Sequence, residues 1–449
     1  MTGKRCVMII RYVFSVGLFA AVAAPLAVAQ DSPCFRGPNR DGSYPGAQLR
    51  LNWAEKPPKI LWKKDVGFGF SQVVTSGKLA LTCGYQPDKD ASFLYCFDAE
   101  TGADQWQIEY KDTFGGARSR LLGPIPTPAI DDGRVYVVAA MGAIYCYELG
   151  TQKKIWEKVT NKDTTAKLGD YGDSVSPVVS GDLVIAHLTL GPDSAAWHAF
   201  QKKDGLVAWT HPVEARKPEK KNDHIDRAYV SAVPFLFKDK PRVILISNAT
   251  IDCVEAGSGK LAWRFPIDDL KMEWGPLIDA IVFDGDKFLL GCWYGNRATA
   301  FVFQMTGDSL KEVWSNKTLG KLTYSYVLRN QYAYGFGPKG MQCVDLKDGG
   351  AKWEWRPEDS RAKKDQGETI LVGDKLVWLS TSGTLYAGEA TPDKPGTVSE
   401  FPVIGRCTKD LKKLKASFNE IICTSPSFSG GRLYCRSPWG EVVCVDVSK

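Results

Sequence analysis

Short apolar runs, each about four to six residues long, recur along nearly the whole chain. Residues 135–139 (VYVVA) and 243–246 (VILI) are examples, and turns containing Gly, Asp or Pro separate such runs. A strand that is exposed on one face alternates apolar and polar residues, whereas a strand covered on both faces need not alternate. The pattern therefore predicts short β-strands packed between neighbouring sheets, with little room for helix.

A longer phrase is built on these runs: an apolar strand, a polar turn with Gly, and then Trp, as in residues 94–106 (LYCFDAETGADQW). Its eight copies begin with strands at 94–98, 144–148, 197–200, 252–255, 300–303, 342–345, 385–387 and 443–446. The tryptophans at 62, 106, 156, 209, 263, 314 and 353 follow one another at intervals of 39 to 54 residues. Such a period suits one four-stranded propeller blade per copy.

The two ends of the repeat array complement each other. The seventh copy has Phe401 where the others have Trp, and the eighth stops at Lys449 before a Trp, while residues 60–62 (ILW) stand alone before the first copy. If the strand carrying Trp62 completes the eighth copy, the units close into a ring without long unpaired edges. We therefore predict an all-β, eight-bladed β-propeller of four-stranded antiparallel blades over residues 59–449, closed by the N-terminal strand. Two stacked sheets are the main alternative, and the eightfold phrase argues against them.

The first 29 residues differ from the rest. Lys4, Arg5 and Arg11 precede an apolar run at 12–28, and A-V-A at 27–29 precedes Gln30. This order is typical of a cleavable secretory signal, with an uncleaved membrane anchor as the alternative. The nearest Cys lies beyond that site, so we expect no lipoprotein anchor.

Cleavage would change the formal net charge from +6 to about +3, which is too weak to indicate nucleic-acid binding. We expect a periplasmic or secreted monomer, without a transmembrane segment after cleavage, in which residues 30–58 form an N-terminal arm.

The repeat phrase resembles the repeat of pyrroloquinoline-quinone (PQQ) propeller proteins. Residues 35–42 (FRGPNRDG) look like the opening of secreted PQQ-like repeat proteins of planctomycete-type bacteria, and residues 343–349 and 440–446 fit the same repeat. The resemblance covers essentially all of the chain after residue 29. It is also similar in domain type to the propeller lipoprotein of the outer-membrane assembly machine. The resemblance implies the propeller fold rather than an activity.

Dehydrogenases of this family hold a planar, tri-anionic quinone and Ca²⁺ over the propeller axis, using a stacking Trp, basic groups and a catalytic Asp. Many also carry an adjacent Cys-Cys pair, which this chain lacks. Residues just before the inner strands could line a comparable axial funnel for an anionic planar ligand. The candidates are Arg118, Arg120, Asp173, Arg227, Tyr229, Glu273, Trp274, Asp279, Tyr324 and Glu368. In a dehydrogenase, Asp173 or Glu368 would serve as base; otherwise these groups only satisfy strand ends and line a channel.

Other polar residues have architectural interpretations. Thr127, Ser176, Ser231 and Ser425 recur at matching positions of their copies, which indicates repeat architecture rather than nucleophiles. We interpret Arg36, Arg40 and Asp41 as parts of an arm pinned to the propeller surface, not as a binding site. The chain has no Gly-rich phosphate loop, G-x-S-x-G turn or HExxH helix, and its four His are scattered. We therefore predict no catalytic and no metal-ligating residue.

Twelve cysteines become eleven once Cys6 is removed with the signal. Five of them share one slot of the repeat phrase, where Ala199 and Ala387 stand in other copies: Cys96, Cys146, Cys253, Cys343 and Cys444. That slot favours a small buried side chain, and equivalent slots on successive blades should be too far apart to bridge. Cys407 and Cys423 flank a Lys-rich segment and are a candidate disulfide; other pairings stay open.

Our leading hypothesis is an exported, non-catalytic propeller that acts, without a cofactor, as a binding or scaffold platform for protein or envelope components. Two alternatives remain open. One is a PQQ- and Ca²⁺-dependent alcohol or sugar dehydrogenase, and the other is a protein that binds a small carbohydrate or polyol in the axial funnel without redox chemistry.

Overall fold

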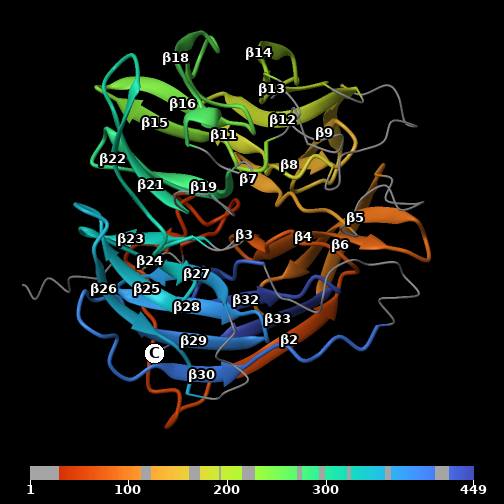
Figure 1. The fold of residues 1–449 in the computed structure, drawn as a ribbon. Helices are drawn as coiled ribbons and strands as arrows, with labels where there is room; N and C mark the ends of the chain where they lie inside the picture. Colours follow the sequence, from red (N-terminus) through yellow and green to blue (C-terminus); the bar gives the residue numbers. More distant parts are fainter. Residues whose placement is uncertain are drawn as a thin grey trace, which may run out of the picture.

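Eight separate β-sheets stand around a common axis in the computed structural model (Figure 1). The structure describes residues 30–112, 123–160, 172–191, 194–214, 228–270, 276–292, 299–320, 325–358, 366–409 and 424–448. Each sheet is a blade of four antiparallel strands, and one blade carries a fifth strand. The prediction of an eight-bladed β-propeller is confirmed.

The strands of a blade follow one another in the chain, from innermost to outermost. Blades 1 to 4 comprise β3 (Val74–Ser76), β4 (Leu79–Gln86), β5 (Ala91–Asp98) and β6 (Asp104–Tyr110); β7 (Ala129–Asp131), β8 (Arg134–Ala139), β9 (Ala143–Glu148) and β10 (Lys154–Val159); β11 (Val178–Ser180), β12 (Leu183–Gly191), β13 (Ser194–Gln201) and β14 (Val207–Pro212); β15 (Val233–Phe237), β16 (Lys240–Ile246), β17 (Thr250–Glu255) and β18 (Leu261–Pro266).

Blades 5 to 7 follow the same order, and blade 8 takes its outermost strand from the start of the chain. They comprise β19 (Pro276–Phe283), β20 (Lys287–Cys292), β21 (Ala300–Met305) and β22 (Leu310–Asn316); β23 (Val327–Arg329), β24 (Tyr332–Gly337), β25 (Gly340–Asp345) and β26 (Ala351–Trp355); β27 (Gly367–Val372), β28 (Lys375–Ser380), β29 (Thr384–Glu389) and β30 (Ser399–Pro402); β31 (Ser427–Ser429), β32 (Arg432–Arg436), β33 (Glu441–Asp446) and β2 (Lys59–Asp65). Within the described ranges, the 3₁₀ turn η1 (Ile267–Leu270) is the sole helical element.

The ring closes as the sequence predicts. Strand β2 pairs antiparallel with β33, in a register that sets Trp62 opposite Cys444 and Asp65 opposite Glu441. A second N-terminal strand, β1 (Ser43–Tyr44), pairs parallel with β27, the innermost strand of blade 7. The sequence analysis does not predict this fifth strand, because two residues carry no periodicity.

Five of the seven tryptophans of the repeat phrase donate a hydrogen bond from their blade to the next one. The indole N–H of Trp62 on blade 8 donates to the carbonyl of Ala99 on blade 1, at 3.3 Å. The same donation runs from Trp156 to Lys202, from Trp209 to Ala256, from Trp314 to Leu346 and from Trp353 to Thr391, at 2.8 to 3.0 Å. The repeated Trp is therefore the contact between blades, and Trp62 makes it across the closure.

The repeated Gly provides the surface on which that indole rests. A Cβ at Gly259, whose φ is +66°, would lie 2.6 Å from the Trp209 ring, and Gly102, Gly205 and Gly349 are placed in the same way against Trp62, Trp156 and Trp314. Side chains other than Gly rarely adopt this backbone conformation, and here they would also displace the indole. The turn and the Trp of the repeat phrase are thus two halves of one contact.

Blade 8 meets blade 1 through a buried arginine as well. Arg436 at the end of β32 is 1% exposed, and its guanidinium donates to the carbonyl of Ser71, to the hydroxyl of Thr82 and to the carbonyl of Cys83. Burial lowers the pKa of Arg436 to about 10. Removing this side chain would leave several buried acceptors without a donor, so it stabilises the closure.

The five cysteines of the repeat slot are buried, at 0 to 2% exposure, and carry free thiols. Burial raises the pKa of each of these thiols to about 12, so they stay protonated and unreactive. They fill the slot as small apolar side chains. Cys407 is half-buried, and Cys423 lies outside the described residues, so the disulfide between them stays a prediction.

No helix among the described residues has the length and apolar character that a membrane span requires.

We predict that Gly259→Ala lowers the free energy of unfolding by about 2–4 kcal/mol, because the new Cβ strains the backbone and displaces the Trp209 indole. Urea unfolding followed by tryptophan fluorescence measures the change. The control is Gly257→Ala in the same turn, where a Cβ meets no atom within 4 Å and the expected change is under about 0.5 kcal/mol. Equal effects of the two substitutions would contradict this account.

Candidate functional site

In each blade, one residue at or just before the innermost strand faces the axis of the ring. We call this residue the axial slot of its blade. In blades 1 to 4, 6 and 8 it stands two residues before the strand; in blades 5 and 7 the strand begins earlier and contains it. The eight slot residues are Gln72, Thr127, Ser176, Ser231, Asp279, Ser325, Glu368 and Ser425.

Hydrogen bonds connect successive slots. The backbone N–H of Gln72 donates to the hydroxyl of Thr127, and that of Thr127 donates to the hydroxyl of Ser176, at 2.9 and 3.0 Å. Two further links end on carboxylates: Ser231 N–H donates to Asp279 at 2.7 Å, and Ser325 N–H donates to Glu368 at 3.2 Å. The hydroxyls of Thr127 and Ser176 thus act in the architecture of the repeat, as expected from their spacing.

The N-terminal arm lies inside the ring rather than on its surface, which corrects our interpretation of Arg36, Arg40 and Asp41. Figure 1 shows this segment, in red, at the centre of the blades. Its backbone contacts the innermost strands of several blades, since Pro33 O accepts from Ile130 N–H and Gly42 O accepts from Leu371 N–H. Sequence reasoning placed the arm outside because its Pro, Asn and Gly indicate a turn but not what surrounds the turn.

Arg36 is the central side chain of the arm and is fully buried, at 0% exposure. Its Nη2 donates to the backbone carbonyls of Asp41 and Tyr326, and its own N–H donates to the Gln72 amide oxygen at 2.8 Å. The Nε and Nη1 donors have no partner among the described residues. A fully buried guanidinium is costly unless compensating charge lies nearby.

The compensating negative charge comes from the two acidic slot residues, Asp279 and Glu368. Burial is the main cause that raises the pKa of Glu368 to about 7; the Ser325 hydrogen bonds and Arg36 oppose this rise, and Asp279 adds a smaller upward contribution. Burial also raises the pKa of Asp279, which Arg36 and the Ser231 hydrogen bond oppose. One buried cation therefore faces two carboxylates whose ionised forms are disfavoured by burial.

A pocket of about 230 Å³ remains between the arm and the inner strands of blades 3 to 5. Its polar lining is supplied by Asn39, Arg40, Asp41, Ser176, Ser231 and Asp279, and its apolar lining includes Phe35, Pro177, Phe235 and Ile281. The pocket is smaller than most cofactor sites. It can hold a small molecule that combines hydroxyl groups with apolar faces.

The structure places three of the eight committed funnel residues. Asp173 is buried and accepts hydrogen bonds from the backbone N–H and the hydroxyl of Thr189, the latter at 2.7 Å, with His187 at 3.8 Å. Tyr229 is half-buried before β15, and Glu368 occupies the slot of blade 7.

Asp173 does not line the pocket, whereas Asp279, also named as a candidate, does. Arg118, Arg120, Arg227, Trp274 and Tyr324, together with Glu273, lie outside the described residues. Their role in a funnel stays a prediction. Sequence reasoning missed Arg36 and Gln72; aligning the copies on their Ser/Thr slots would have singled out Gln72 and the two acidic slots as exceptions.

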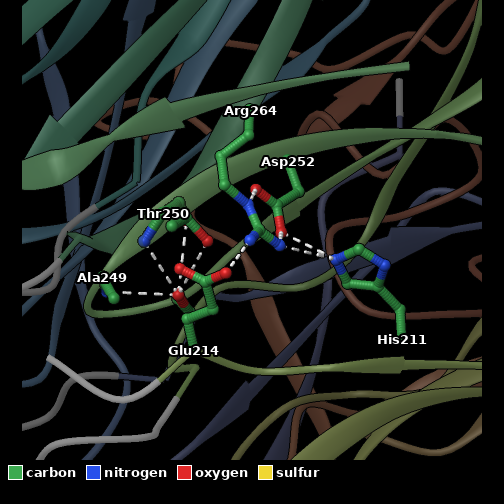
Figure 2. A network of polar contacts seen from close by, with 7 residues as sticks. His211, Glu214, Ala249, Thr250, Asp252 and Arg264 are labelled. Carbon is green, nitrogen blue, oxygen red and sulfur yellow. Dashed lines mark hydrogen bonds and ion pairs between the residues drawn. The ribbon is translucent and has the colours of Figure 1, made fainter. Parts of the chain in front are cut away.

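A second polar network joins blades 3 and 4 away from the axis (Figure 2). The Asp252 carboxylate on β17 accepts from His211 Nε2 of β14 at 2.7 Å and from two guanidinium nitrogens of Arg264 at 2.7 and 2.8 Å. Arg264 also pairs with Glu214. Burial opposes ionisation of Asp252, but the bonds from His211 and Arg264 hold its pKa below the ordinary value. Both carboxylate oxygens of Asp252 already accept hydrogen bonds from His211 or Arg264. We therefore interpret the network as a structural contact that holds blades 3 and 4 together.

The described part of the axis does not fit a tri-anionic quinone with Ca²⁺. Arg36 and Arg40 face Asp279, Glu368 and Asp41, so these groups bring no excess of positive charge for three carboxylates. Nor do three His, Cys, Asp or Glu side chains gather into a metal-binding group within the ranges that the structure describes.

Comparisons with known proteins agree with the repeat. Residues 54–246 match the model of a PQQ-repeat family described as outer membrane protein assembly factor BamB. No curated protein matches the sequence.

Several solved structures share the fold at low sequence identity. Quinohemoprotein alcohol dehydrogenase from Comamonas testosteroni aligns with a TM-score of 0.62 at 13% identity, covering 94% of this chain and 81% of that one. A europium-containing methanol dehydrogenase aligns at 0.59 and 12%, covering 84% and 86%. BamB from Moraxella catarrhalis aligns at 0.41 and 13%, covering 85% and 84%. At these identities the likeness to the two dehydrogenases shows the fold alone, and the alignment with BamB carries no argument.

We predict that the contribution of Glu368 to the free energy of unfolding falls by up to about 3 kcal/mol as the pH rises. The folded-state pKa, about 7, lies above the ordinary 4.5, so the folded protein binds the extra proton. This contribution is complete below about pH 4.5 and is lost as the pH passes through 7. The measurement is the difference between the urea-unfolding profiles of the wild type and Glu368→Gln from pH 4.5 to 8; parallel profiles would refute it.

Proposed function

This chain is a PQQ-like repeat β-propeller, and we propose that it is an exported binding protein of the cell envelope that works without a redox cofactor. The observation that carries the proposal is the position of Arg36. The protein fills its own axis with this buried side chain, whose charge acts on the two acidic slots, at the place where a catalytic propeller of this type would need free basic groups. Its remaining surface is then the part available to partners.

Two further observations support a protein partner in the envelope. The family model that matches residues 54–246 is described as an outer membrane protein assembly factor. The basic and apolar N-terminus with its A-V-A end is typical of exported chains. We propose that the protein is a periplasmic or secreted monomer that binds a protein or another envelope component and does not bind nucleic acid.

The dehydrogenase alternative is tested by adding PQQ and Ca²⁺ to the purified chain. We expect gel filtration to remove all quinone absorbance and no alcohol to reduce a dye, because the axial groups do not offset a tri-anion. A quinoprotein alcohol dehydrogenase reconstituted in parallel is the control. Retained quinone with dye reduction would overturn the proposal.

A small neutral polyol in the pocket beside the arm is the second candidate. Arg40 and Asn39 offer donors there, Asp279 and Asp41 offer acceptors, and Phe35 offers an apolar face. The positive and negative side chains that line the pocket nearly balance, which favours a neutral ligand over an ion. Equilibrium dialysis with glucose and glycerol tests this candidate: saturable binding that Asp279→Asn abolishes would support it, and no binding would discard it.

A further inference from the structure

The arm enters the axis from the end of the ring at which the innermost strands finish. Asp31 accepts from the N–H of Gly77, just after β3 ends, and Arg36 then reaches the slot of Gln72 at the other end of the same strand. The chain turns there and returns beside β27, where Ser43 and Tyr44 pair with Leu371 and Val372. Residues 31–46 therefore form a loop inserted along the channel, with Arg36 near its tip.

The loop is attached to the ring mainly by neutral hydrogen bonds, and Arg36 supplies its deeply buried charge. The tip is closely fitted: Gly42 has a φ of +81°, and a Cβ there would lie 3.0 Å from Val327 and 3.2 Å from the Arg36 guanidinium. Seating the tip thus removes Arg36 and Glu368 from water, whereas Asp279 is half-buried beside the pocket. The free energy of seating depends on how that charge is balanced.

The balance has a simple stoichiometry. Arg36 carries one positive charge, and the acidic groups on which it acts are Asp279 from β19 and Glu368 from β27. Arg40 and Asp41 line the pocket beside Asp279 and add one charge of each sign, so they leave this balance unchanged. With one carboxylate ionised the buried set is neutral, and with both ionised it carries an uncompensated negative charge. A buried charge without a partner is strongly unfavourable, whereas withdrawal of the tip would return it to water.

The other titratable groups around this set stay neutral in the same pH range. Burial raises the pKa of Tyr44 to about 12 and that of Tyr326 well above its ordinary value. It likewise raises the pKa of Cys34 to about 11 and that of Cys292 to about 12. Among the described residues, the ionisation of the axis near neutral pH therefore rests on the two acidic slots.

We propose that residues 31–46 are a pH-dependent plug of the axial channel, seated while Arg36 faces one ionised carboxylate and released when Asp279 and Glu368 are both ionised. The plug holds under acidic conditions and loosens as the medium becomes alkaline. Its release exposes the ring of slot residues to solvent and to any ligand of suitable size. The proposal goes beyond the binding role above, since it concerns access to the axis.

The sign follows from proton linkage. Glu368 has a pKa of about 7 when the tip covers it and approaches 4.5 when water reaches it, so the seated form binds the extra proton. Rising pH then favours the open form, by up to about 300-fold across the interval between the two values.

Hydrogen–deuterium exchange of the full chain, corrected for the intrinsic rate at each pH, tests the plug. The reporters are peptides covering residues 31–46, where Arg36 N–H donates to Gln72, and Gly37 and Gly42 N–H donate to Cys34 and Arg36 carbonyls. Peptides from β28 and β32 report whether the ring stays folded. We expect protection of the arm, relative to these strands, to fall on the order of 100-fold between pH 5 and pH 8.

Two variants separate charge from packing. Glu368→Gln removes the second ionisable group, so the arm should stay protected at pH 8; Asp279→Asn leaves Glu368 alone to balance Arg36 and should also keep the arm seated. Glu400→Gln, on the exposed face of β30 in the same blade, is the control and should behave like the wild type. Arm protection that does not change with pH in the wild type, or that falls equally in all three variants, would overturn the proposal. Either acidic variant suffices for the test if the other does not fold.

Discussion

The contact between the tryptophan of one blade and the glycine turn of the next is the interaction on which this fold depends. A four-stranded blade alone exposes apolar residues on both faces, so it is stable only between two neighbours. The indole covers the end of that interface, and its N–H satisfies a carbonyl of the following blade, as Trp209 does for Ala256. Because Trp62 repeats this contact across the closure, the last blade is held by the same bond as the others.

The sequence shows this architecture clearly because each element of the contact has its own residue type. Trp, Gly and the buried Cys slot recur with the blades, and the missing eighth Trp predicts the closure by the strand at residue 62. In the turn of blade 2, Gln152 stands at the position that Gly102 has in blade 1 and adopts a φ of 62°, so the left-handed conformation is kept although the residue is not Gly.

The site is less predictable, for a physical reason. Asp173 and Asp279 both precede or begin an inner strand, yet one carboxylate turns to Thr189 and the other faces the axis. The direction of each carboxylate depends on the residue at which the inner strand begins. The hydrophobic periodicity predicts that residue only to within a few positions. Arg36 is harder still, because its surroundings come from blades 1, 6 and 7, and no local pattern encodes contacts at such separation. The roles of Arg118, Arg120 and Arg227 stay predictions.

The closure also orders events in time. Arg436 bonds to Ser71 across 365 residues, Gln72 bonds to Pro426 across 354, and β2 finds its partner only in the last strand of the chain. The amino-terminal strand β2 is thus among the last to reach its native surroundings, because its partner β33 follows the other seven blades in the chain. The blades themselves consist of strands that are consecutive in the chain, so the large sequence separation is confined to the closure and the arm.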